Sequence, residues 1–128
     1  MNAYHLDTYV LVFACAHAGS ERAKLLAILD AGEAVGMSAW AWYELRRGPR
    51  TPEQMAAAEM LLGGAGIVPV SADFADEAAE QFRLLGSPRR RAADILIGVT
   101  ARVCGARLLT RNAADFAGIA NLVVEPCG

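Results

Sequence analysis

The sequence predicts an α/β fold, a three-layer α/β/α domain with a mainly parallel central sheet. Short apolar runs alternate with longer segments of helical periodicity along the whole chain, and this order is typical of a parallel sheet that helices cover on both faces. The size agrees, because 128 residues of which 55% are hydrophobic are enough for one domain with its own core. We therefore expect residues 1–128 to form a single domain.

Five short apolar segments, several of them rich in β-branched residues, are the expected strands. They are Ala3–Leu6, Ala34–Met37, Ile67–Val70, Arg107–Leu109 and Leu122–Glu125. Right-handed crossovers would bring the carboxyl ends of these strands to one edge of the sheet. In open sheets of this kind, ligands bind beyond that edge.

The expected helices begin at residues that commonly cap helices and end at glycine or proline. They are Tyr9–His17 after Thr8, Glu21–Ala31 after Ser20, Trp40–Arg47 after Ser38, a helix from Thr51-Pro52 to about Leu62 before Gly63-Gly64, one from Ser71 to about Leu85, and Arg90–Val103 before Gly105. A short turn or helix is expected at Asn112–Phe116.

Acidic and amide residues stand where this apolar chain tolerates charge least. Asp7 follows the first strand and Glu44 lies in the helix after the second. Asp94 lies in an apolar helix that leads to the fourth strand, and Asn112 and Asp115 follow that strand. A carboxylate in apolar surroundings stays protonated or needs a cation. Several carboxylates at one sheet edge suggest a Mg²⁺- or Mn²⁺-dependent phosphoryl-transfer site.

Composition and missing motifs exclude several function classes. A net charge of −2 argues against a general nucleic-acid coat, although a local basic patch is compatible with it. The 3 cysteines form no C-x-x-C pair, which indicates reduced thiols in a cytoplasmic protein. No apolar run has the roughly 20 residues of a membrane helix. The chain also lacks G-x-S-x-G, P-loop and G-x-G-x-x-G motifs, and His5 and His17 are isolated.

Four segments, in chain order, resemble the successive blocks of a PIN-domain ribonuclease. They read HLDTYVLV, SAWAWYELRRG, ADILIGVTARVCGARLLTRNAADFAGI and LVVEP. The likeness is strongest to VapC-type toxins of type II toxin–antitoxin pairs. The block from Asp94 to Phe116 is its most specific part.

The resemblance implies a metal-dependent endoribonuclease in which a metal-activated water attacks a phosphodiester. Asp7 matches the first acid of the family, Glu44 the second and Asp94 the third, with Mg²⁺ or Mn²⁺ as cofactor. Many relatives carry an acid where Asn112 stands, and Asp115 matches a further acid, so either position could be the fourth. The expected supporting residues of the site are Thr8, Thr110 and Asn112. Tyr9 departs from the small polar residue that is usual after Asp-Thr.

The same resemblance implies partners. They are an RNA substrate, a small VapB-type antitoxin that fills the active-site region, and a second copy of the chain in a homodimer. No membrane association is expected. The RNA target and the cleavage site are left open.

Nearly all basic residues are arginines, and six of them fall in two clusters that flank proposed metal ligands. Arginine suits phosphate through its bidentate fork. The expected RNA-binding residues are Arg46, Arg47, Arg50, Arg89, Arg90 and Arg91. A solvated surface is the other interpretation of these clusters.

Two alternatives stay open. Asp7 could simply cap a helix with Thr8, and Glu44 could pair with Arg47 or Arg50, which would leave a PIN-like protein-binding module with weak or no catalysis. A phosphoacceptor domain that uses Asp7 as nucleophile would need a phosphate-contacting lysine after a late strand, and the one lysine is Lys24.

Overall fold

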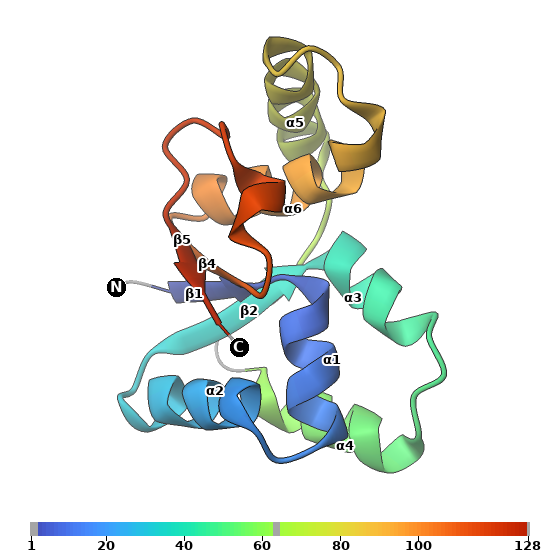
Figure 1. The fold of residues 1–128 in the computed structure, drawn as a ribbon, viewed down its shortest axis with the longest axis vertical. Helices are drawn as coiled ribbons and strands as arrows, with labels where there is room; N and C mark the ends of the chain where they lie inside the picture. The colour runs from blue at the N-terminus through green and yellow to red at the C-terminus, as the bar shows by residue number, and fades with distance from the viewer. Residues whose placement is uncertain (1–2, 63–64, 128) are drawn as a thin grey trace.

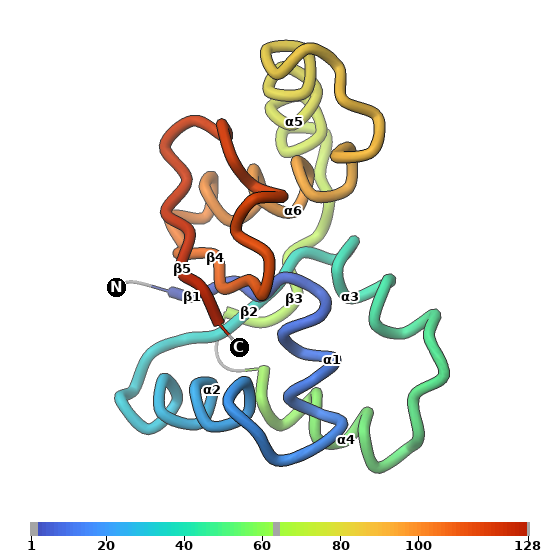
Figure 2. The backbone as a smooth tube through the Cα atoms, in the orientation of Figure 1, coloured from blue at the N-terminus to red at the C-terminus, as the bar shows by residue number. Residues whose placement is uncertain are grey.

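The computed structural model describes residues 3–62 and 65–127. Five strands form one sheet within these ranges: β1 (Ala3–Leu6), β2 (Ala34–Ser38), β3 (Gly66–Val68), β4 (Arg107–Thr110) and β5 (Val124–Pro126). Their order across the sheet is β3-β2-β1-β4-β5, and all four neighbouring pairs are parallel. Figure 2 shows β1 between β2 and β4 at the centre of this sheet. The predicted parallel sheet is therefore confirmed.

Helices cover both faces of the sheet. They are α1 (Thr8–Ala16), α2 (Ser20–Asp30), α3 (Ala39–Arg46), α4 (Pro52–Leu61), α5 (Ala72–Leu84) and α6 (Ala92–Val103), with 3-10 turns η1 (Arg89–Arg91) and η2 (Ala113–Phe116). Figure 1 shows α1, α2 and α4 together on one side and α6 with α5 on the other. Because α3 contacts both α1 and α6, it lies where the two helical layers meet. The three-layer α/β/α fold is thus confirmed.

Several side chains of the central strands β1 and β4 are buried. Leu6 in β1 and the pair Leu108 and Leu109 in β4 are fully buried and belong to the hydrophobic core. His5 is also buried at 1% exposure, and this burial lowers its pKa to about 4, so the imidazole is neutral in the fold. None of the helices in the described ranges is both long and apolar enough to cross a membrane.

A glycine lets α6 approach the segment that carries η2. A Cβ at Gly98 would stand 2.8 Å from the Ile119 side chain and 3.3 Å from that of Phe116. Ile95 and Val99 of α6 are buried in the same core. The absence of a side chain at Gly98 therefore brings η2, and Asp115 with it, close to α6.

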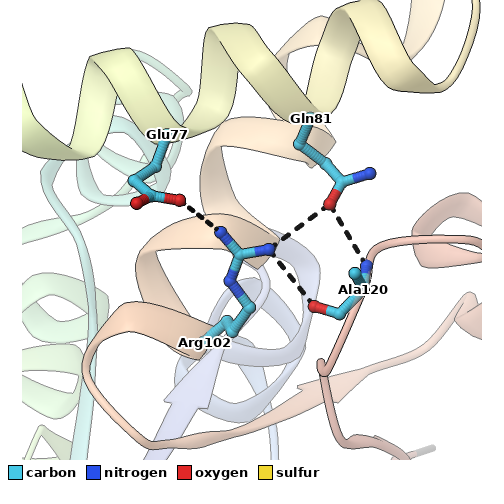
Figure 3. Close-up of polar contacts among 4 residues, drawn as sticks. All are labelled: Glu77, Gln81, Arg102 and Ala120. Carbon is cyan, nitrogen blue, oxygen red and sulfur yellow. Dashed lines mark hydrogen bonds and ion pairs between the residues drawn. The ribbon is translucent and has the colours of Figure 1, made fainter.

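Arg102 ties α5 to α6 and to the segment before β5 (Figure 3). Its guanidinium donates to Glu77 at 2.8 Å, to Gln81 at 3.3 Å and to the carbonyl of Ala120 at 3.2 Å. The N–H of Ala120 donates in turn to Gln81 at 3.2 Å. This network fixes the outer helix α5 without contacting the carboxyl edge of the sheet.

Several expected helix starts are confirmed. Ser38 accepts from the N–H of Ala41 at 3.1 Å, and Thr51 forms a capping box with Gln54. Ser71 caps α5 through the N–H of Phe74. These caps are local in sequence, which is why the sequence pattern predicts them.

Other boundaries differ from the expectation. Thr8 is the first residue of α1 and Asp7 is its cap, while α2 starts at Ser20 after an N-cap glycine without a side-chain bond. The expected helix from Arg90 is split, with η1 before an α6 that begins at Ala92. Strand β3 ends at Val68, whose partner Ser38 is the last residue of β2. The expected stop at Gly63-Gly64 lies outside the described residues.

An acidic pocket at the carboxyl edge of the sheet

Asp7 is held by two neighbouring parallel strands. Its N–H donates to the carbonyl of Leu109 at 2.9 Å, which continues the ladder between β1 and β4. One carboxylate oxygen accepts from the N–H of Thr8 at 2.8 Å, and the other accepts from the hydroxyl of Thr110 at 2.9 Å. Asp7 is therefore a helix cap, and its carboxylate is also fixed at the carboxyl edge of the sheet.

Thr8 links the first helix to Glu44. The Thr8 hydroxyl, which is buried, donates to Oε1 of Glu44 at 2.9 Å. Oε2 of Glu44 stands 3.6 Å from Nη2 of Arg47, the residue that follows α3. The expected pairing with Arg47 is thus present, and the bond to Thr8 still places Glu44 beside Asp7.

Asn112 and Asp115 form one unit at the end of β4. The Asn112 amide donates to Oδ2 of Asp115 at 2.8 Å, and the Asp115 N–H donates to the Asn112 carbonyl at 3.1 Å. The backbone N–H of Asn112 donates to the Thr110 hydroxyl at 3.0 Å. Thr110 therefore connects Asp7 on one strand with Asn112 after the next.

These residues converge on one pocket of about 500 Å³. Its lining consists of Asp7, Thr8, Tyr9, Glu44, Asp94, Arg111, Asn112 and Asp115. All four acids and two of the three supporting residues predicted from the sequence line it, and the third, Thr110, is buried directly behind Asp7. Their roles in chemistry stay predictions. The exposed ring of Tyr9, at 62% accessibility, forms part of the rim.

Burial and neighbouring charges both act on Asp94, in the first turn of α6. Its pKa is raised to about 6, first by burial and then by the charges of Asp7, Asp115 and Glu44, while Arg91 acts in the opposite direction. Burial also raises the pKa of Asp7, although hydrogen bonds from Thr110 and Thr8 oppose this rise. Four carboxylates thus share a space in which the charges of Asp7 and Asp94 are costly.

The donor set fits a hard divalent cation. Carboxylate oxygens are the ligands that Mg²⁺ and Mn²⁺ prefer. Within residues 3–62 and 65–127, no group of three acidic, histidine or cysteine side chains is placed so that it could hold a metal ion. A divalent cation in this pocket would therefore need water ligands in addition to the carboxylates, or a movement of these side chains.

The arginines predicted to bind RNA fall into different surroundings. Arg47 and Arg50 line a second hollow of about 390 Å³ that shares Thr8, Tyr9 and Glu44 with the acidic pocket. Arg46, Arg89 and Arg90 are exposed. Arg91 instead donates to the carbonyls of Asp115 and Ala117 and so holds η2. The structure gives Arg91 a supporting role at the site, and its contact with RNA stays a prediction.

Sequence reasoning missed Arg111, which lines the pocket. Its Nε donates to Glu21 at 3.1 Å, and its guanidinium carbon lies 3.8 Å above the centre of the Phe13 ring. The sequence feature that could have indicated Arg111 as a site residue is its position between Thr110 and Asn112, directly after a central strand. The Glu21 partner gave no signal, because it lies 90 residues away in the chain.

Several solved structures share this fold over nearly the whole chain. VapBC2 from Rickettsia felis, bound to a promoter DNA fragment, has a TM-score of 0.76 at 22% identity and covers 98% of this chain and 99% of that chain. DNA-bound VapBC from Salmonella typhimurium has a TM-score of 0.72 at 18% identity, with 98% of each chain covered. A toxin–antitoxin complex from Klebsiella pneumoniae has a TM-score of 0.68 at 24% identity, covering 94% of this chain and 96% of that one.

A search of curated proteins gave no match. Residues 4–122, by contrast, match the PIN domain family. This range contains every residue of the acidic pocket. The sequence resemblance and the parallel three-layer fold agree with this match. The chain belongs to the PIN domain family.

Proposed function

We propose that this protein is a metal-dependent endoribonuclease and acts as a VapC-type toxin. The observation that carries the proposal is the convergence of four carboxylates, from four separate segments, on one pocket at the carboxyl edge of a parallel sheet. Membership of the PIN domain family and the sequence resemblance to VapC-type toxins support the same activity.

In this proposal Asp7, Glu44, Asp94 and Asp115 would hold Mg²⁺ or Mn²⁺. A bound divalent cation supplies an activated water and stabilises charge on the leaving oxygen of the phosphodiester. Thr110 and Thr8 orient the carboxylates of Asp7 and Glu44 through the hydrogen bonds described above.

Further residues of the chain bind substrate or hold the site together. Asn112 orients Asp115 through its amide. Arg47 and Arg50, in the adjoining hollow, and the exposed Arg46, Arg89 and Arg90 would contact the RNA backbone.

The proposed partners follow from the same family relationship. The similar solved structures include toxin–antitoxin complexes, and we propose a small VapB-type antitoxin that covers the pocket. A homodimer and a cytoplasmic location complete the proposal. Expression of the chain alone should then arrest growth of a bacterial host, and Asp7→Ala should relieve the arrest.

Cleavage of RNA by the purified protein tests the activity. We expect cleavage with Mg²⁺ or Mn²⁺, none with a chelator, and a loss of at least about a hundredfold in Asp7→Ala, because Asp7 connects the two central strands to the pocket. Asp30→Ala, at the end of α2, is the matched control because its carboxylate does not line the pocket. Equal cleavage by Asp7→Ala and the control would refute the site.

A protein-binding module with weak or no catalysis is the second candidate. One observation favours it: a neutral amide at Asn112 already occupies an oxygen of Asp115. The exposed rings of Tyr9, Trp40 and Tyr43 also suit protein contact. A folded protein that binds an antitoxin peptide and cleaves no RNA under any divalent metal would select this candidate.

The phosphoacceptor alternative finds no support around Asp7. Lys24 does not line the pocket, and its ammonium group pairs with Glu125 at 2.9 Å.

A further inference from the structure

Arg111 is the only basic residue among those that line the acidic pocket in the described part of the chain. It follows the last residue of β4 and precedes Asn112, so the backbone of a central strand fixes its position. A phosphodiester that approaches four carboxylates meets repulsion, and a cation at the rim would oppose it. Arg111 therefore stands where a cation would offset this repulsion.

The guanidinium of Arg111 is held from two sides. Its Nε donates to Oε2 of Glu21 at 3.1 Å, and its central carbon lies 3.8 Å above the ring of Phe13. The side chain of Glu21 is 7% exposed and that of Arg111 is 39% exposed. The carboxylate therefore sits inside the protein and the guanidinium at the surface, in a single orientation.

This arrangement leaves donor groups unused. Over the described residues, the bond from Nε to Glu21 is the one hydrogen bond that the guanidinium makes. Its two terminal amino groups remain available, although four carboxylates line the same pocket. A guanidinium pinned through Nε can present this remaining edge to a phosphate with little further loss of side-chain freedom.

We propose that Arg111 binds a phosphate of the RNA backbone at the rim of the acidic pocket, and that Glu21 and Phe13 are positioning residues that hold its guanidinium there. The inference rests on the proposed ribonuclease function and names one contact that this function would use. Arginine recognises phosphate through parallel N–H bonds, which an ammonium group cannot reproduce.

Cleavage kinetics with a short single-stranded RNA of mixed sequence test the inference. Replacing Arg111 alone would leave the Glu21 carboxylate buried without a partner, which destabilises a fold. The main variant is therefore the double substitution Glu21→Gln with Arg111→Gln, which removes both charges. Arg111→Lys is the second variant, and Arg107→Gln, at the other end of β4, is the matched control. Melting temperatures establish that each protein is folded.

We expect the double variant to raise KM about tenfold, since a charge-assisted bond to phosphate is lost. The slope of log KM against log salt should fall by about 0.7, the value for one phosphate contact on a single strand. Arg111→Lys should keep the slope and lose part of the affinity. Arg107→Gln should change neither quantity.

Each other outcome is decisive. If the unaltered protein cleaves RNA and the folded double variant shows the same KM and salt slope as the control, the inference fails and the ribonuclease function stands. A rise in KM without a change in slope would mean that the ion pair only supports the fold, which also overturns the inference. An unaltered protein that cleaves no RNA with any divalent metal removes both proposals.

Discussion

At the scale of single residues, Asp94 carries most of the electrostatic cost of the acidic pocket. Its position in the first turn of α6 favours a negative charge. Burial and the three neighbouring carboxylates outweigh this effect and raise its pKa from 3.8 to about 6. Ionisation of Asp94 therefore lowers the stability of the metal-free fold.

Asp94→Asn should raise the melting temperature of the metal-free protein at neutral pH, because it removes a disfavoured charge. The folded pKa lies above the unfolded one, so the stability associated with the protonated form is fully present below pH 3.8 and is lost as pH rises through about 6. The advantage of the variant should accordingly shrink as pH falls below 6. Thermal unfolding in a chelator measures it, with Asp30→Asn as control. An advantage that is equal at every pH would contradict this reading of Asp94.

Asn112 is a neutral residue beside Asp115 in the acidic pocket. Its amide donates to Asp115 at 2.8 Å, so Asn112→Asp exchanges a favourable bond for a repulsion. The variant should be less stable without metal and bind Mg²⁺ or Mn²⁺ more tightly, because hard cations depend on ligand charge. Thermal unfolding in a chelator checks the stability, and calorimetric titration checks the affinity. Unchanged affinity in Asn112→Asp, with a large loss in Asp115→Asn, would leave Asp115 as the fourth acid.

At the scale of elements, the short turn η2 depends on an arginine from another segment. Arg91 donates to the carbonyls of Asp115 and Ala117, and Gly98 lets the same segment lie close to α6. The carboxylate of Asp115 is positioned by these contacts and not by helix propensity, since η2 has only 4 residues.

Arg91→Ala should lower the free energy of unfolding by about 1–3 kcal/mol, because two charged hydrogen bonds to backbone carbonyls are lost. Arg90→Ala, its exposed neighbour, should change stability little. Both variants should lower the salt slope of RNA binding, since both arginines are predicted to contact the RNA backbone. Chemical denaturation and RNA binding of the two variants separate these effects. Equal stability of both would mean that Arg91 does not hold η2.

How well the sequence predicted each element depended on how local its determinants are. Ser38, Thr51 and Ser71 cap helices through bonds to residues three positions ahead, and all three were predicted. The start of α1 was misplaced by one residue, because Asp7 and Thr8 can both cap a helix. In the structure Asp7 accepts from the Thr8 N–H, and the Thr8 hydroxyl donates to the distant Glu44 instead. The break between η1 and α6 falls at Arg91, whose side chain bonds the carbonyl of Asp115, and no local pattern shows this contact.

At the scale of the whole molecule, the parallel sheet explains why acidic residues that are distant in sequence lie together. Parallel strands place their carboxyl ends on one edge, so residues just after β1 and β4 had to be neighbours. This rule predicted the convergence of Asp7 with Asp115 from topology alone. It could not predict the pairing of Arg111 with Glu21, which depends on how α2 packs beside the strand ends.

We propose that carboxylates from separate elements form one divalent-cation site. Calorimetric titration of Mn²⁺ into the unaltered protein, Asp94→Asn and Asp30→Asn measures whether they do. We predict saturable binding in the unaltered protein and in Asp30→Asn, and affinity at least about tenfold weaker in Asp94→Asn, since a hard cation loses one charged ligand. Equal affinity in all three folded proteins, or no saturable binding in the unaltered one, would contradict the claim.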